Sequence, residues 1–191
     1  MLNLPSSFIL FDTEYTAWEG SLERNWSGQN EYQEIVQIGA IKVDNQKLAE
    51  VGSLVIFVKP KLNPDLSNYF IRLTGITRQT LDKKGVDFRP ALIKFKKWCG
   101  QLPIYSYGGD ESMLKGNCGF LKIPFPLQTL QFHDIRDIFE SHGISAEKYF
   151  SGSIVEAFGK KSSRQAHDAL NDARSILDGL IELNKKLSRQ K

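Results

Sequence analysis

The amino-acid sequence predicts an α/β fold in which a mixed β-sheet is flanked by helices. Three observations lead to this prediction. A short apolar run opens the chain at residues 7–15, two β-rich runs follow between residues 34 and 60, and later strand patterns alternate with amphipathic helices. A hairpin beside a first strand produces antiparallel pairs, and alternating strands and helices produce parallel pairs. Both kinds of pair are therefore expected in one helix-covered sheet.

The first two elements are a buried strand and a long loop. Residues 7–15 are apolar at Phe8–Phe11 and become acidic near their end, which is typical of a short buried strand. Residues 16–33 are polar, contain Gly, Asn and Ser, and carry Trp18 and Trp26. Because long loops in compact domains are usually functional or disordered, this segment is a candidate lid or substrate loop.

The middle of the chain is predicted to contain a hairpin and two helices. Asp44-Asn45 separates the two β-rich runs of residues 34–60, which is a hairpin signal. Residues 73–84 are typical of a short helix after a turn. Residues 87–100 have the spacing of an amphipathic helix that ends at Gly100.

The C-terminal half is predicted to contain one more strand and three helices. The strand at residues 102–107 leads into a helix that Asp110 opens, and a small helix is expected around residues 153–159. The last element is a long helix within residues 167–187. Its apolar stripe consists of Leu170, Ala173, Ile176, Leu177, Leu180 and Ile181.

Length and composition are those of an ordinary globular protein. The 191 residues are 41% hydrophobic and 25% charged, so we expect a single domain that spans residues 1–191. A net charge of +3 is compatible with phosphate binding and does not establish it. The N-terminus lacks the basic start of a signal peptide, no segment has the length of a membrane span, and Cys99 and Cys118 lack metal-ligand spacing. These features predict a cytoplasmic protein in which both thiols act as small apolar side chains.

Two acidic residues stand near the end of the first strand. Asp12 and Glu14 are two positions apart, and the side-chain period of a strand therefore points both carboxylates to one face. Two anions this close in a buried site repel unless a cation neutralises them, and oxygen ligands on a rigid strand suit Mg²⁺ or Mn²⁺. The alternative is an acidic strand end exposed to water.

Further candidates stand where helices begin. Asp110 opens a helix directly after a strand, where it is either an N-cap or part of a site at the strand ends. His167 and Asp172 are five residues apart, a separation that would place them on different faces of one helix. They share a site if His167 lies on the preceding loop and Asp172 lies one turn inside the helix. Asp168 is then left to cap the helix and complement its dipole, and the alternative for His167 is a surface histidine at the helix entry.

The order D-x-E, D, H-x4-D is far more specific than any one of these residues. It resembles the DnaQ-like, or DEDDh, family of 3′–5′ exonucleases, in particular its Eri-type and KapD-like stand-alone members. FDTEYT matches the first motif of the family, YSYGGDESML the second and HDALNDA the third. Between the first two motifs, EIVQIGAIKV and LTGIT match the second strand of the family and the turn that follows it.

The resemblance implies a ribonuclease H-like fold and a metal-dependent hydrolysis. The products would be nucleoside 5′-monophosphates released from the 3′ end of single-stranded RNA or DNA. The resemblance assigns His167 as the general base. This role suits a histidine, because an imidazole with a pKa of about 6.5 accepts a proton near neutral pH. The ligands it assigns to two divalent cations, Mg²⁺ or Mn²⁺, are Asp12, Glu14, Asp110 and Asp172.

Substrate contacts are expected beside the terminal nucleotide and in the long loop. Leu73 and Thr74 match a family segment that lies next to that nucleotide. Tyr15, Trp18 and Trp26 are candidate stacking platforms for bases, with loop packing as the alternative. Basic side chains that either contact phosphates or form a solvated face are Arg72, Arg78, Lys83 and Lys84.

Three other functions are compatible with the pattern. They are a catalytically silent nucleic-acid-binding module, an endonuclease of the ribonuclease H type, and a small-molecule phosphodiesterase or oligoribonuclease capped by residues 16–33. The complete set of acidic residues and the histidine argues against a silent module, and HDALNDA favours the exonuclease. The sequence does not specify RNA or DNA, the substrate length, the pathway, the oligomeric state or which aromatic residues stack on bases.

Overall fold

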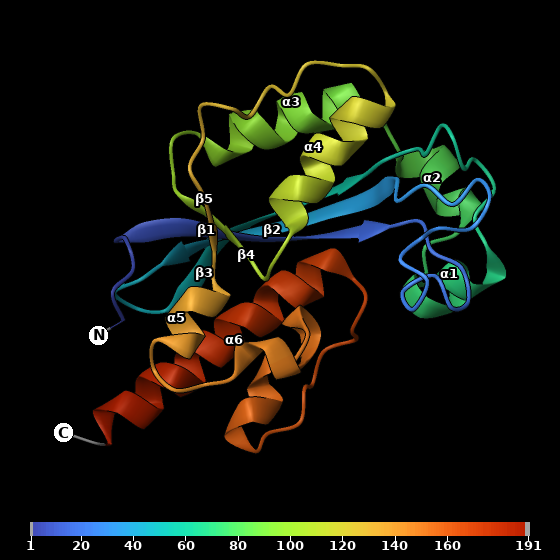
Figure 1. Cartoon of the computed structure of the whole chain (residues 1–191). Helices are drawn as coiled ribbons and strands as arrows, with labels where there is room; N and C mark the ends of the chain where they lie inside the picture. The colour runs from blue at the N-terminus through green and yellow to red at the C-terminus, as the bar shows by residue number, and fades with distance from the viewer. Residues whose placement is uncertain (1, 190–191) are drawn as a thin grey trace.

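The centre of the computed structural model, which describes residues 2–189, is a five-stranded mixed sheet (Figure 1). The strands are ordered β3-β2-β1-β4-β5 across the sheet. Their bounds are β1 Ser7–Tyr15, β2 Ile35–Asp44, β3 Ala49–Phe57, β4 Ile104–Ser106 and β5 Phe132–Asp134. β2 pairs antiparallel with β1 and β3, whereas β4 runs parallel to β1 and β5. The predicted hairpin and mixed sheet are confirmed.

β1 lies in the middle of the sheet because its side chains are apolar on both faces. Phe8, Ile9, Leu10 and Phe11 are all fully buried. Phe8 and Leu10 belong to one hydrophobic cluster, and Ile9 and Phe11 belong to another, as the side-chain period of two requires. A strand that is buried on both faces needs a layer of helices on each side of the sheet.

Helices supply both layers (Figure 1). The first layer consists of α3 (Phe88–Cys99) and α4 (Asp110–Phe120), whose apolar faces join the cluster of Ile9 and Phe11. The second layer, on the cluster of Phe8 and Leu10, consists of α5 (Arg136–Glu140), the 3₁₀ helices η1 (Ala146–Lys148) and η2 (Ser151–Phe158), and α6 (Ala169–Ser188). No helix among residues 2–189 is long and apolar enough to cross a membrane.

The predicted stripe of α6 forms its buried face. Ala173, Ile176, Leu177 and Leu180 are buried in the second layer. Leu170 and Ile181, at the two ends of the stripe, pack against the same cluster and are partly buried.

Two short helices, α1 (Asn68–Thr74) and α2 (Arg78–Lys84), lie beyond the end of β1 (Figure 1). The sequence predicted α2 but described the end of α1 only as a turn. α1 is stabilised locally because Ser67 caps its first turn and Gly75 ends it at a φ of +72°. Neither α1 nor β5 was predicted from the sequence, whereas α2 and β4, which have the same lengths, were predicted.

Residues 16–33 form a loop without helix or strand, as predicted. The indole N–H of Trp26 donates to the carbonyl oxygen of Thr16 at 3.0 Å. At the end of the loop, the buried carboxylate of Glu34 accepts a hydrogen bond from the backbone N–H of Lys61 at 2.7 Å. These contacts hold the loop beside the end of β1.

Candidate active site

The first pair of carboxylates lies near the end of β1. Asp12 and Glu14 are both buried, and they lie on the same side of the strand because they are two residues apart. Between them, Thr13 donates its hydroxyl to Asp110 Oδ1 at 2.6 Å. This hydrogen bond joins β1 to the start of α4 and brings a third carboxylate to the strand end.

Asp110 is the first residue of α4, and Gly109 occupies the N-cap position. The Asp110 side chain makes no capping hydrogen bond, so the alternative that it serves as the N-cap is wrong. Its carboxylate is buried instead, and burial raises its pKa to about 6. The third predicted acidic residue therefore lies in the site.

His167 and Asp172 have the arrangement that their spacing predicted. His167 precedes α6, and Asp172 lies in its first turn. Asp168 is the N-cap, and its side chain accepts a hydrogen bond from the backbone N–H of Asn171 at 3.0 Å. The backbone N–H of His167 donates to Asp172 Oδ2 at 3.1 Å. As a result, ligand atoms of Glu14, His167 and Asp172 all lie within 4.8 Å of one another.

The four carboxylates repel one another in a buried place. Burial, followed by the charge of Asp172 and Asp110, raises the pKa of Glu14 to about 9. Burial, followed by Asp110 and Glu14, raises the pKa of Asp12 well above its usual value. Burial also raises the pKa of Asp172 to about 7. Such a cluster is stable as anions only when a cation neutralises it.

One atom of this cluster directly supports a metal site. Asp172 Oδ1 is buried and has no hydrogen-bond partner among the described residues. Buried polar atoms are normally paired, so an unpaired carboxylate oxygen needs a ligand. Four hard oxygen donors fit Mg²⁺ or Mn²⁺. Divalent cations therefore fit the residues that are present.

The imidazole of His167 lies at the open edge of this cluster. Its side chain is accessible to solvent, while the protein atoms around it still lower its pKa below the usual value of 6.5 through partial burial. The neutral imidazole is therefore the main form at pH 7, which is the form that accepts a proton.

β2 supplies two residues of the site that the sequence reasoning missed. Gln37, opposite Glu14 in the sheet, donates from Nε2 to Asp168 Oδ2 at 3.1 Å and accepts from the backbone N–H of Ala169 at 2.9 Å. A Cβ atom on Gly39 would lie only 2.1 Å from the backbone nitrogen of Leu170. In the sequence, the only indication of this role is that Gln37 and Gly39 are two residues apart in an otherwise apolar strand. The residues that they contact are evident only from the fold.

η2 supplies two more missed residues. The Ser151 side chain lies near Asp12 and partly offsets the rise in the pKa of that carboxyl. A Cβ atom on Gly152 would lie 2.6 Å from Asp172 Oδ1, so glycine is needed for η2 to lie this close. No pattern around Ser151 and Gly152 in the sequence indicates this role.

The predicted substrate residues surround the end of β1, and their contacts are mainly structural. Thr74 is buried, and its hydroxyl donates to the Phe70 carbonyl at the end of α1. The rings of Tyr15 and Trp26 pack at a centroid distance of 5.4 Å, which is the loop packing that was given as the alternative to base stacking. Leu73 and Trp18 are half-buried. Stacking of any of these rings on a base stays a prediction.

The predicted basic residues are near the same end of the molecule. Arg72 and Lys83 are exposed, whereas Arg78 forms an ion pair with Asp82 on the same helix. Lys84 lies over the ring of Phe57. Their contact with phosphates stays a prediction.

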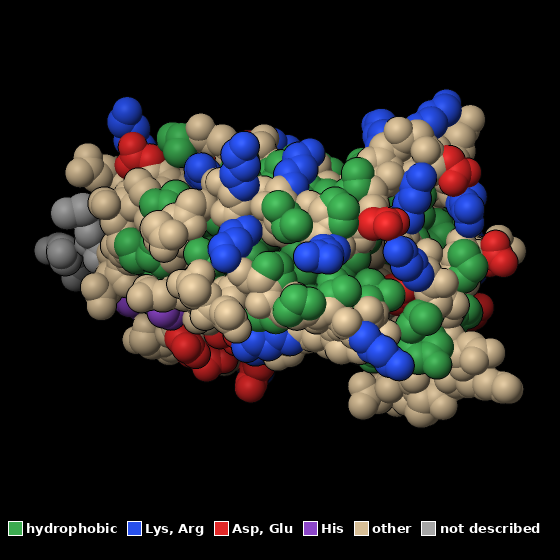
Figure 2. All heavy atoms as spheres, turned by 90° about the horizontal axis from the view of Figure 1, so that it is seen from above, with side chains coloured by type: hydrophobic (Ala, Val, Ile, Leu, Met, Phe, Trp, Pro, Cys, Tyr) green, Lys and Arg blue, Asp and Glu red, His purple; other side chains and the backbone are tan. Residues whose placement is uncertain are grey.

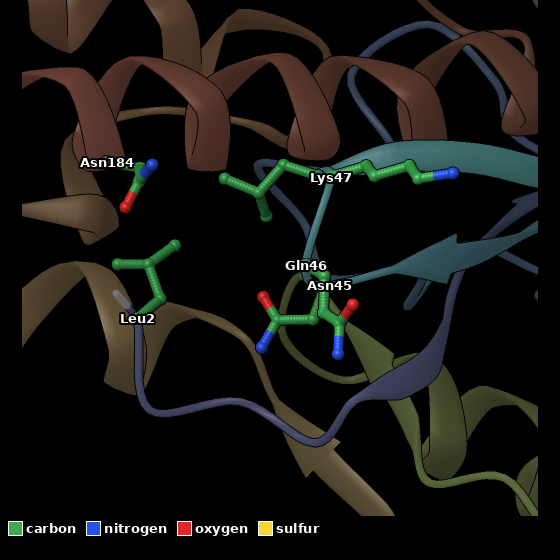
Figure 3. Close-up of a pocket in the computed structure, with 6 residues that line it drawn as sticks. Leu2, Asn45, Gln46, Lys47 and Asn184 are labelled. Carbon is green, nitrogen blue, oxygen red and sulfur yellow. The ribbon is translucent and has the colours of Figure 1, made fainter.

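A separate pocket lies at the opposite end of β1 (Figure 3). It is formed by the turn between β2 and β3, the N-terminal segment and the C-terminal half of α6. The residues that line it are Leu2, Asn45, Gln46, Lys47, Leu48 and Asn184. No acidic residue or histidine is among them, so this pocket has no connection with the carboxylate cluster.

Comparison with known proteins identifies the family and the fold. A family model described as Exonuclease (RNase_T) matches residues 9–179. The chain is 28% identical to the probable 3′-5′ exonuclease KapD of Bacillus subtilis, covering 95% of this chain and 87% of KapD. It is 26% identical to the 3′-5′ exonuclease Snipper of Drosophila melanogaster, covering 90% and 67%. The nuclease domain of 3′hExo, a DEDDh family member bound to rAMP, has a TM-score of 0.81 at 19% identity, covering 97% of this chain and 95% of that domain. This last match confirms the ribonuclease H-like fold.

Proposed function

Because the chain belongs to the Exonuclease (RNase_T) family and is a 3′–5′ exonuclease, we propose how its residues carry out that reaction. The substrate is the 3′ end of a single-stranded nucleic acid, and the products are nucleoside 5′-monophosphates. The observation that carries the proposal is the convergence of four buried carboxylates, one with an unpaired oxygen, beside a histidine.

The carboxylates hold two divalent cations, Mg²⁺ or Mn²⁺. Asp12 and Glu14 come from β1, Asp110 comes from α4, and Asp172 comes from α6. When bound, the cations supply positive charge that stabilises the negative charge developing on the phosphate. Thr13 orients the carboxylate of Asp110 through a hydrogen bond, and Ser151 lies near the carboxylate of Asp12.

His167 accepts the proton of the attacking water at its imidazole. The imidazole is neutral at pH 7 because partial burial lowers its pKa. The Asp172 carboxylate and the Gln37 amide hold the backbone on either side of the histidine. In this proposal, Leu73, Tyr15 and Trp18, which are half-buried, contact the terminal nucleotides.

The alternatives differ in what they cut. A silent module would bind nucleic acid without hydrolysis, although all five positions of the site are filled. A ribonuclease H-type endonuclease would cut strands internally, and an oligoribonuclease would act only on very short ones. The 3′hExo structure contains rAMP, so RNA is the first substrate to test, with DNA beside it.

Metal dependence is the direct test. Activity on end-labelled single-stranded RNA and DNA should vanish in EDTA and return with Mg²⁺ or Mn²⁺, because the cluster requires neutralisation. Glu14→Gln should abolish the activity, whereas Glu147→Gln, a matched change at an exposed glutamate, should leave it unchanged. Full activity in chelator, or an active Glu14→Gln variant, would exclude the two-metal proposal.

The setting proposed for the protein is a reducing cytoplasm. Cys99 and Cys118 are free, buried and part of the hydrophobic cluster under α3 and α4, where they act as small apolar side chains. We further propose that residues 1–191 form one exonuclease domain.

A further inference from the structure

The positive charge of the chain is concentrated in one short segment. Residues 83–97 contain six basic residues and one acidic residue, whereas the rest of the chain contains 19 basic and 21 acidic residues. The net positive charge of this segment is therefore larger than that of the whole protein, because the rest of the chain is slightly negative. It comprises the end of α2, a short connection and most of α3.

The basic side chains of α3 point away from the core. The buried face of this helix consists of Phe88, Ala91, Leu92, Phe95 and Cys99. Arg89, Lys94 and Lys97 are exposed on the opposite side. Figure 2 looks down on this layer and shows Lys and Arg side chains spread over it, between hydrophobic ones. We call Arg89, Lys94 and Lys97 the α3 basic face.

Ion pairs within the protein do not account for this charge. In residues 2–189, the nearby pair is Lys61 with Asp87, and no ion pair involves a member of the α3 basic face. Lys94 and Lys97 are three residues apart on one helix, where like charges destabilise it. An external anion would relieve this repulsion.

We propose that the α3 basic face binds the sugar–phosphate backbone of the substrate strand upstream of its 3′ end. Charge complementarity supports a polyanion. The exposed large apolar residues in this segment are Val86 and Ile93, neither of them aromatic, so the contacts are to phosphates rather than to stacked bases. α3 covers the same face of the sheet as α4, the helix that begins at Asp110 (Figure 1).

This inference rests on the proposed function and is tested by substrate length. The triple variant Arg89→Glu, Lys94→Glu, Lys97→Glu is compared with a control of equal charge change. The control is Lys47→Glu, Lys148→Glu, Lys186→Glu, at exposed positions outside α3. Hydrolysis is measured on a dinucleotide and on a strand of about 30 nucleotides at several salt concentrations. Binding is measured with each set in a Glu14→Gln background.

The expected result separates long from short substrates. The triple variant should bind the long strand at least about tenfold more weakly than the control and should show a shallower dependence of log Kd on log salt, because phosphate contacts are lost. Dinucleotide hydrolysis should be unchanged, which also shows that the variant is folded. The unmodified protein should itself show a steep salt dependence with the long strand and a shallow one with the dinucleotide.

Two failures are distinguishable. If the unmodified protein hydrolyses neither substrate, the proposed function fails. If it hydrolyses both, but the triple variant and the control bind the long strand equally, or the salt dependence does not change with length, the α3 basic face is a solvated surface and the inference is overturned.

Discussion

His167 adopts a backbone conformation that residues other than glycine rarely take. Its φ of +60° lies in the left-handed region. Such strain persists only where the surrounding structure holds it, and Gln37 does so through its hydrogen bonds to Asp168 and Ala169. The conformation directs the imidazole to the carboxylates instead of the outer surface of α6.

His167→Ala should lower the turnover rate by about 10²–10⁴-fold, the usual contribution of a positioned general base. The wild-type rate should rise with pH as the imidazole loses its proton and then level off. Because the pKa of His167 lies below 6.5, the rise should be largely complete at neutral pH. Metal affinity should change little, since the four carboxylates remain. Rates measured from about pH 5 to about pH 9 at saturating Mg²⁺ check these points.

Asp168→Ala provides the control for the histidine. This variant removes the adjacent N-cap of α6, so it should cost about 0.5–2 kcal/mol of folding free energy and leave the shape of the pH profile unchanged. Near-wild-type turnover of His167→Ala, or a greater loss of turnover in Asp168→Ala, would show that the base has been assigned wrongly.

The raised pKa values of the cluster predict how the metal-free protein responds to pH. Glu14 and Asp172 bind protons more tightly in the folded state than in the unfolded state, so their protonated forms stabilise the fold at low pH. This stabilisation is lost as pH rises through the pKa of Asp172, about 7, and then through that of Glu14, about 9. In EDTA, Tm should fall between about pH 5 and about pH 9, and Mg²⁺ should restore it. Asp12→Asn should make this fall smaller, because one repelling anion is gone.

Thermal denaturation in chelator checks this prediction. Asp65→Asn, which neutralises an exposed carboxylate, should leave the slope of Tm against pH unchanged. A metal-free protein whose Tm is constant over this range, or an Asp12→Asn variant with the wild-type slope, contradicts the expected repulsion.

Among the elements, β2 and α6 have the closest contact that affects the site. Gly39 lies so near the first turn of α6 that no side chain fits between them. The same turn contains Asp172, and His167 directly precedes its cap. The distance between β2 and α6 therefore determines where these two residues lie.

Gly39→Ala should separate α6 from the sheet, because its Cβ would overlap the backbone of Leu170. We expect a destabilisation of about 1–3 kcal/mol or more, and a loss of turnover that exceeds it when the variant is assayed while folded. Gly52→Ala is the matched control, since a Cβ on this β3 glycine meets no atom within 4 Å. Urea denaturation and steady-state kinetics of both variants test the prediction. Equal behaviour of the two would mean that α6 docks without this contact.

Elements with strong patterns were predictable from the sequence, and two elements with weak patterns were not. β1 has a continuous apolar pattern because it is buried along almost its whole length, and α6 has a helical apolar pattern because one of its faces is buried as far as Leu183. The off-helix position of His167 also followed from the sequence, because five residues of helix cannot place it beside Asp172. α1 is marked by its cap residues rather than by an apolar period, and β5 is a three-residue edge strand defined by its pairing with β4.

On the scale of the whole molecule, the site is assembled from distant parts of the chain. The three motifs predicted its acidic residues and its histidine, because the order of the motifs can be recognised in the sequence without knowledge of the fold. The contributions of β2 and η2 were missed. Gln37 forms a hydrogen bond with Asp168, which is 131 residues later in the sequence, and Gly152 matters only because its backbone lies close to the Asp172 side chain. Residues that act by closeness of packing have no sequence signature of their own.

Direction of degradation is a property of the whole molecule. A 3′-phosphate or another block at the 3′ end should slow degradation strongly, whereas a block at the 5′ end should not, because the site acts on the terminal 3′ nucleotide. Product ladders from strands labelled at the opposite end check the direction. Internal cuts in a circular strand would favour the ribonuclease H-type endonuclease instead.

The position of the last helix in the chain has a consequence during protein synthesis. Domains begin to fold from the N-terminus while the ribosome is still translating. Asp12, Glu14 and Asp110 emerge first, but His167 and Asp172 take their places only after α6 has left the exit tunnel and docked on β2. A nascent chain is therefore expected to lack nuclease activity until α6 has left the exit tunnel and docked on β2.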